Sequence, residues 1–242
     1  MYDPKMYDPR QHLIVALDVS SAAAAQKIVA AVGDSALTYK VGMQLFTAEG
    51  PRVVRDLVAS GRRVFLDLKY HDIPTTVAAA VREAANLGVG MLTVHAGGGG
   101  KMLRAATDAA RIANPALMVL GVTVLTSMDD QDLDKVGVRG RVVDHVLRLA
   151  ALAITNGCQG VVASALEASE LRSELGDHFL IVTPGVRPAG QDHGDQSRVV
   201  TPAEAIAAGA TYIVVGRPIT AAANPAGEAR SILEQMSLAV SA

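Results

Sequence analysis

Short apolar runs alternate with longer, alanine-rich stretches along most of the chain. Segments such as Leu13-Ile14-Val15-Ala16-Leu17 and Ile213-Val214-Val215 are almost continuously apolar, which is typical of parallel strands that are covered on both faces. Segments long enough for a helix separate these runs. The pattern predicts eight strands, at residues 12–19, 37–43, 63–69, 91–96, 117–125, 160–164, 179–185 and 212–216.

Eight strand–helix units without a linker rich in Pro, Gly or Ser favour one closed barrel over two smaller domains. The fold class that we expect is therefore α/β, a single-domain (β/α)8 TIM barrel over residues 11–242. An open, doubly wound sheet is the structural alternative. Residues 1–10 contain the repeat Met1-Tyr2-Asp3-Pro4 and Met6-Tyr7-Asp8-Pro9, and we expect them to form a poorly ordered N-terminal extension.

Composition narrows the classes of partner. A hydrophobic content of 50% in 242 residues supplies a large core. The net charge of −2 and the aromatic content of 3% disfavour nucleic acid as a partner. Because there is no apolar run of about 18 residues and no apolar core of a secretory signal, we predict a cytoplasmic protein without a membrane partner. Cys158 is the only cysteine, so an internal disulfide is excluded and a buried apolar role is the simplest one.

Charged side chains gather where the predicted strands end. The stretch Asp67-Leu68-Lys69-Tyr70-His71-Asp72 closes the third strand, and alternation along a strand directs Asp67 and Lys69 to the same face. Asp18 ends the first strand and Lys40 lies in the second. Each has an ordinary explanation, as a helix cap, a surface lysine or a strand-end ion pair. Because the carboxyl ends of barrel strands meet at one rim, we expect these residues to share a site.

The ends of the last two strands indicate a phosphate site. The seventh strand ends in Thr183-Pro184-Gly185-Val186-Arg187 and leads into a polar loop, 188–198, that contains Gln196. The eighth ends in Gly216-Arg217. Glycine lets the backbone approach a ligand and arginine offers forked donors, as at the phosphate sites that barrels often build after strands seven and eight. Arginines that only solvate the loops are the alternative.

No metal-binding set stands out among the charged residues. Asp18, Asp67 and Asp72 could hold Mg²⁺, but Lys40 and Lys69 among them would repel the ion. Asp72 also has a purely structural explanation, since acids favour the start of a helix. We therefore expect no metal and no cofactor.

Six short motifs follow one another through the chain: Ala16-Leu17-Asp18, Lys40-Val41-Gly42, Asp67-Leu68-Lys69-Tyr70-His71-Asp72-Ile73-Pro74, Val124-Leu125-Thr126-Ser127, Pro184-Gly185-Val186-Arg187 and Val215-Gly216-Arg217-Pro218-Ile219. With them, the chain resembles the orotidine 5'-monophosphate decarboxylase family from the first strand to the final helix. The resemblance implies decarboxylation of orotidine 5'-monophosphate (OMP) to uridine 5'-monophosphate (UMP), the last step of de novo UMP synthesis. It also implies a homodimer whose active sites are shared across the interface.

The resemblance further implies a role for each matching residue. Asp67 would sit beside the substrate carboxylate and Lys69 would deliver the proton to the pyrimidine carbanion. Asp72, with Ile73 and Thr76, would reach the neighbouring subunit's site. The catalytic set implied is a Lys-Asp-Lys-Asp array of Lys40, Asp67, Lys69 and Asp72. The other contacts implied are Asp18 and Lys40 with the ribose, Thr126 or Ser127 with the pyrimidine edge, and Arg187, Gln196, Gly216 and Arg217 with the phosphate.

Two other functions fit part of the pattern. A metal-dependent decarboxylase of sugar phosphates shares the Asp-x-Lys-x-x-Asp spacing, but is expected to carry an acid where this chain has Lys40. A noncatalytic barrel that senses a nucleotide could keep Arg187 and Arg217, but would have no need for Lys69 between two acids.

Overall fold

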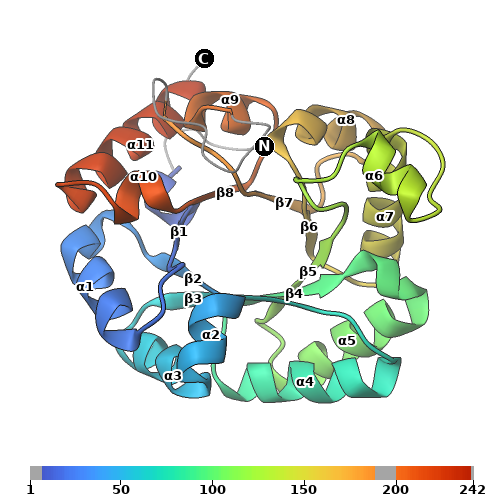
Figure 1. The fold of residues 1–242 in the computed structure, drawn as a ribbon, viewed down its shortest axis with the longest axis horizontal. Coiled ribbons are helices and arrows are strands. Elements are labelled where there is room, and N and C mark those ends of the chain that lie inside the picture. The colour runs from blue at the N-terminus through green and yellow to red at the C-terminus, as the bar shows by residue number, and fades with distance from the viewer. Residues whose placement is uncertain (1–6, 189–199, 241–242) are drawn as a thin grey trace.

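Eight parallel strands close into a barrel in which each strand pairs with the next and the last pairs with the first (Figure 1). The structure is a computed structural model that describes residues 7–188 and 200–240. The strands are β1 (Leu13–Ala16), β2 (Thr38–Gly42), β3 (Arg63–Tyr70), β4 (Met91–His95), β5 (Met118–Val122), β6 (Gly160–Val162), β7 (Leu180–Thr183) and β8 (Tyr212–Val215). The expected (β/α)8 TIM barrel is confirmed, and the open sheet is excluded.

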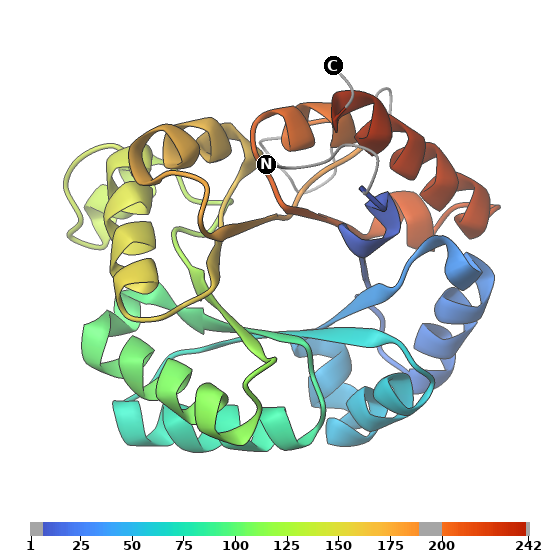
Figure 2. The same cartoon turned by 180° about the vertical axis from the view of Figure 1, so that it is seen from behind.

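Helices surround the barrel and cover its outer face, as both ends of the molecule show (Figures 1 and 2). The α-helices are α1 (Ala22–Val32), α2 (Met43–Glu49), α3 (Pro51–Ala59), α4 (Pro74–Asn86), α5 (Gly99–Ala113), α6 (Asp130–Lys135), α7 (Val142–Thr155), α8 (Ala165–Leu175), α9 (Pro202–Ala207), α10 (Arg217–Thr220) and α11 (Pro225–Val240). Short 3₁₀ helices are η2 (Pro9–Gln11), η3 (Gly33–Ser35) and η4 (Ala96–Gly98). No helix among the described residues is both long and apolar enough to cross a bilayer.

Local sequence explains where several helices start. Capping boxes start α6, α8 and α9, with Asp129, Ser164 and Thr201 as the capping residues. In each box, the side chain of the capping residue accepts a hydrogen bond from the backbone amide three residues later, and the side chain of that later residue accepts one from the amide of the capping residue. Proline occupies the first turn of α3, α4 and α9, where its missing N–H costs no hydrogen bond. These local signals fix where each of these helices begins.

Two apolar clusters form the core. The larger lies between the strands and the surrounding helices, and includes the buried Cys158, whose thiol has its pKa raised to about 12 by burial. The smaller cluster fills the barrel itself, where strand residues interdigitate in layers. Its members are Ile14, Ala16, Phe65, Met91, Leu120, Val182, Tyr212 and Val214.

The described part of the N-terminal segment contacts the barrel. Asp8 caps η2 by accepting a hydrogen bond from the Arg10 amide. The Tyr7 ring stacks on His12 with centroids 4.7 Å apart. Residues 1–6 lie outside the described residues.

The ladder between β3 and β4 is irregular at one point. Leu66 pairs with Leu92 and Tyr70 with Val94, so that three residues of β3 stand opposite the single Thr93 of β4. Lys69 lies in this bulge with a φ of +52°, and is the only non-glycine residue with positive φ in the described part of the chain. Bulges of this kind re-aim side chains next to functional sites.

Candidate active site

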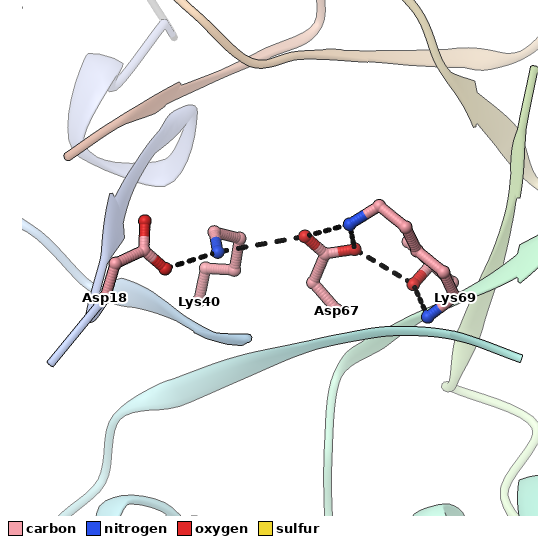
Figure 3. Close-up of polar contacts among 5 residues, drawn as sticks. Asp18, Lys40, Asp67 and Lys69 are labelled. Carbon is pink, nitrogen blue, oxygen red and sulfur yellow. Dashed lines mark hydrogen bonds and ion pairs between the residues drawn. The ribbon is translucent and has the colours of Figure 1, made fainter. Parts of the chain in front are cut away.

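A row of alternating charges crosses one rim of the barrel (Figure 3). Lys40 Nζ lies 2.8 Å from Asp18 Oδ1 and 3.8 Å from Asp67 Oδ2. Lys69 Nζ lies 2.9 Å from Asp67 Oδ1 and 3.0 Å from its Oδ2. Asp18 follows β1, Lys40 belongs to β2, and Asp67 and Lys69 belong to β3. The sequence-based expectation that the charged strand ends meet in one place is therefore confirmed.

The inner three members of the row are largely shielded from water. The side chains of Lys40 and Asp67 are each 13% exposed and that of Lys69 is 25% exposed, whereas Asp18 is 58% exposed. At an effective dielectric of 20, two unit charges about 4 Å apart interact by roughly 4 kcal/mol. The Asp67 carboxylate is held between the ammonium groups of Lys40 and Lys69. A charge that develops beside it would interact with these fixed, preorganised charges.

Thr93 supports this row from β4, and sequence reasoning missed it. Its hydroxyl donates to Asp67 Oδ1 at 3.0 Å and accepts from the Lys69 amide at 2.9 Å. The sequence offered only a partial signal, a threonine within the otherwise apolar run Met91-Leu92-Thr93-Val94, which places a polar side chain in a buried strand.

Two adjoining cavities lie beside the charged row. The larger, about 440 Å³, is lined by Asp18, Lys40 and Asp67 together with Arg187, Gly216 and Arg217. The smaller, about 170 Å³, is mostly apolar, with Phe65, Val122 and Val124 in its wall and Thr126 and Lys69 beside them. Lys40, Asp67, Pro184 and Val214 line both cavities. The site therefore has a charged half and an apolar half that meet at Asp67.

One arginine in the wall of the larger cavity has an N–H group without a partner among the described residues. Arg187 is 8% exposed, and its buried Nε has no hydrogen-bond partner among the described residues. A buried guanidinium group without a complete set of acceptors favours an anion. Gly216 faces the same cavity, and a Cβ there would lie 3.5 Å from Ala16 Cβ and 3.8 Å from Asp18 Oδ2. A larger side chain at position 216 would therefore contact Ala16 and Asp18 and take up space in the cavity.

Other predicted site residues lie apart from the row within a single chain. Asp72 Oδ1 accepts a hydrogen bond from the Ile73 amide at 2.6 Å. Asp72, Ile73 and Thr76 are exposed at the start of α4, and none of them lines either cavity. Ser127 is also exposed and does not line them, unlike Thr126. Gln196 and most of the loop 188–198 lie outside the described residues.

A histidine pair flanks the site at the ends of β3 and β4. The rings of His71 and His95 lie 5.3 Å apart. Burial lowers the pKa of His95, and the neighbouring His71 and Lys69 lower it further. The neutral form of the His95 ring is therefore favoured, although the Asp67 carboxylate acts in the opposite direction.

Comparison with known proteins identifies relatives that cover most of the chain. The family model described as "Orotidine 5'-phosphate decarboxylase / HUMPS family" matches residues 11–232. An orotidine 5'-phosphate decarboxylase of Moorella thermoacetica is 50% identical over 235 residues, covering 95% of this chain and 93% of the relative. The relative of the same description from Hydrogenovibrio crunogenus is 49% identical over 217 residues, covering 90% of this chain and 92% of the relative.

Solved structures give the same result. The crystal structure of orotidine 5'-phosphate decarboxylase from Lactobacillus acidophilus superposes with a TM-score of 0.85 at 39% identity, covering 93% of this chain and 99% of that one. The resemblance seen in the six sequence motifs is therefore confirmed: the chain belongs to the orotidine 5'-phosphate decarboxylase / HUMPS family.

Proposed function

We propose that this chain decarboxylates OMP to UMP, the last step of de novo UMP synthesis, without a metal or cofactor. The observation that carries the proposal is the row Asp18–Lys40–Asp67–Lys69, in which each ammonium group lies within 4 Å of a carboxylate. The closely similar relatives described as orotidine 5'-phosphate decarboxylases support the same reaction. The cytoplasmic location stays a prediction from the sequence.

The reaction requires fixed charge at the reacting carbon. When the bond between C6 of the pyrimidine and its carboxylate breaks, carbon dioxide leaves and the electron pair stays on C6, in the plane of the ring. No ring π system delocalises a pair in that plane, so stabilisation must come from preorganised charge. Lys69 Nζ supplies that charge and then gives a proton to C6. Asp67, 2.9 Å from Lys69 Nζ, orients the ammonium group.

The two halves of the site fit the two ends of the substrate. The apolar cavity with Thr126 at its edge suits a pyrimidine ring. Arg187 and Arg217 offer planar donor groups to the phosphate, and Gly216 leaves room for it. Asp18 and Lys40, between the two ends, suit the ribose hydroxyls. Binding energy from the phosphate would hold the base in position for a step that takes place at the other end.

Lys40 distinguishes this proposal from a metal-dependent sugar-phosphate decarboxylase. Its ammonium group lies between the carboxylates of Asp18 and Asp67, at 2.8 and 3.8 Å. A divalent cation bridging the same oxygens would have to displace it. The nucleotide-sensing alternative does not explain the Lys69–Asp67 pair, and shielding such a pair from water is costly.

Two chains would complete the site. Asp72, Ile73 and Thr76 are exposed at the start of α4 and are not part of the row in their own chain, and Ile73 is 63% exposed. The family resemblance implies that these three residues reach the neighbouring subunit's site. We therefore propose a two-fold dimer in which Asp72 of each chain enters the partner's site.

The test is the decrease in ultraviolet absorbance as the purified protein converts OMP to UMP. The same assay is repeated after dialysis against EDTA and after adding back Mg²⁺. Full activity in EDTA is expected. If OMP is not turned over, the proposed function is wrong; if turnover requires Mg²⁺, the metal-dependent alternative is correct.

A further inference from the structure

We infer that Thr93 is a positioning residue that holds Asp67 and Lys69 together in their reactive arrangement, an inference that rests on the proposed decarboxylation. Thr93 lies on β4 and is fully buried. It lines neither cavity. It therefore acts on the reaction through the two residues that it contacts.

The Thr93 hydroxyl makes two hydrogen bonds whose directions are fixed. The Lys69 amide can only donate, so Thr93 Oγ1 accepts from it at 2.9 Å. The single hydroxyl proton is then left for Asp67 Oδ1, at 3.0 Å. Because Asp67 in turn holds Lys69 Nζ at 2.9 and 3.0 Å, one hydroxyl group fixes both the backbone of the proposed proton donor and the carboxylate that orients its ammonium group.

The backbone at Lys69 needs such support. A φ of +52° is unfavourable for a residue with a Cβ, because the Cβ then lies too close to the following carbonyl oxygen. The bulge also removes the Lys69 amide from the regular β3–β4 ladder, since Leu66 and Tyr70 are the paired residues on either side. The Thr93 hydroxyl replaces the missing main-chain acceptor. Without the Thr93 hydroxyl, the half-buried Lys69 amide would lose its hydrogen-bond partner, and the bulge would lose this hydrogen bond to β4.

The conformation of Lys69 thus depends on a side chain of the neighbouring strand. A regular strand would place Asp67 and Lys69 side by side, with both side chains pointing the same way. In the bulge, Lys69 Nζ returns instead to both oxygens of Asp67. Misplacement of reacting groups by about 1 Å can cost roughly 100-fold in rate, so loss of the Thr93 hydroxyl should be felt in kcat.

The experiment compares Thr93→Val, which keeps the shape but removes the hydroxyl, with Thr93→Ser, which keeps the hydroxyl. Thr38→Val is the matched control, because Thr38 is a fully buried strand threonine whose Oγ1 has no partner among the described residues. Thr93→Val should lower kcat by about 10- to 150-fold, the loss expected for one hydrogen bond to a charged group. KM for OMP and the Kd for UMP should change less than threefold. Thr93→Ser should stay within about fivefold of the wild type, and Thr38→Val within twofold.

Each other result overturns the inference. A Thr93→Val enzyme with normal kcat would show that the hydroxyl does not position the row. Equal losses in Thr38→Val, or a Thr93→Ser enzyme as slow as Thr93→Val, would show a general effect on folding. If Thr93→Val does not fold, Thr93→Ala takes its place, and the same loss in kcat, about 10- to 150-fold, is expected. An inactive wild type would instead overturn the proposed function itself, and the inference with it.

Discussion

Replacing Lys69 with alanine tests the centre of the proposed mechanism. The variant keeps the Cβ, so the left-handed backbone at position 69 is no less strained than before. It removes the ammonium group that lies 2.9 Å from Asp67 Oδ1. Asp67 retains Lys40 at 3.8 Å and the Thr93 hydroxyl at 3.0 Å. We therefore expect a folded protein, destabilised by about 1.5–3 kcal/mol, the range for a hydrogen bond to a charged group.

The expected loss of rate has two sources. Loss of a general acid costs about 10²- to 10⁴-fold. Loss of a unit charge about 4 Å from the developing carbanion costs roughly 4 kcal/mol at an effective dielectric of 20, or about 10³-fold in rate. Since the same group provides both effects, the combined loss in kcat for Lys69→Ala should be about 10⁵- to 10⁷-fold. Binding of UMP should weaken by less than about 10-fold, because the phosphate end of the site is unchanged.

The assay is single-turnover decarboxylation of OMP at enzyme concentrations well above substrate, with UMP binding measured by calorimetry on the same preparation. Lys27→Ala, on the exposed face of α1, controls for the loss of a lysine elsewhere. A Lys69→Ala enzyme that loses less than about 100-fold in kcat would refute the role of Lys69 as both charge and proton donor.

Three further results are expected. Arg217→Ala should raise KM for OMP by about 10- to 150-fold in steady-state kinetics, because it removes a charge-assisted hydrogen bond; a change below threefold would argue against phosphate binding there. When equal amounts of Lys69→Ala and Asp72→Ala chains exchange subunits, about a quarter of all sites should become intact if Asp72 acts across a two-fold interface, and verified exchange without recovered activity would place Asp72 in its own site. Burial lowers the pKa of His12, whose Nδ1–H donates to the Thr211 carbonyl at 2.8 Å. The neutral ring is therefore favoured in the folded state, and stability that is complete above about pH 6.5 is lost as the pH falls. His12→Asn keeps an amide donor but does not titrate, so urea unfolding should show a smaller loss of stability from pH 7 to pH 5 than in the wild type; an equal loss would contradict this.

Much of the barrel could be predicted from the sequence, because parallel strands buried on both faces leave uninterrupted apolar runs. The strand ends were less predictable. Leu17 and Val19 continue the apolar pattern of β1, but the strand ends at Ala16, and only the Leu17 amide adds one more bond, to the Lys40 carbonyl at 2.9 Å. The chain stops pairing with the neighbouring strands at the mouth of the barrel. The hydrophobic pattern of the sequence does not show at which residue this happens.

The site shows a different limit. Strand alternation predicted that Asp67 and Lys69 would be neighbours, and they are. Alternation did not predict the bulge in which Lys69 lies, because positive φ at a lysine has no signature in the residue type. Thr93 escaped notice for a related reason. Its partners, Asp67 and the Lys69 amide, come from another strand, so its position became meaningful only once the register of β3 on β4 was known.

The floor of the apolar cavity is also the upper layer of the barrel core. Phe65 and Val214 belong to both the interior cluster and the cavity wall. Truncating a buried phenylalanine to alanine typically costs about 3–5 kcal/mol, a large part of the roughly 5–15 kcal/mol that stabilises a domain. Changing Phe65 or Val214 to accommodate a bulkier or smaller base would therefore also weaken the barrel core. Natural or engineered changes of substrate specificity at these two residues would therefore first require stabilising mutations elsewhere in the barrel.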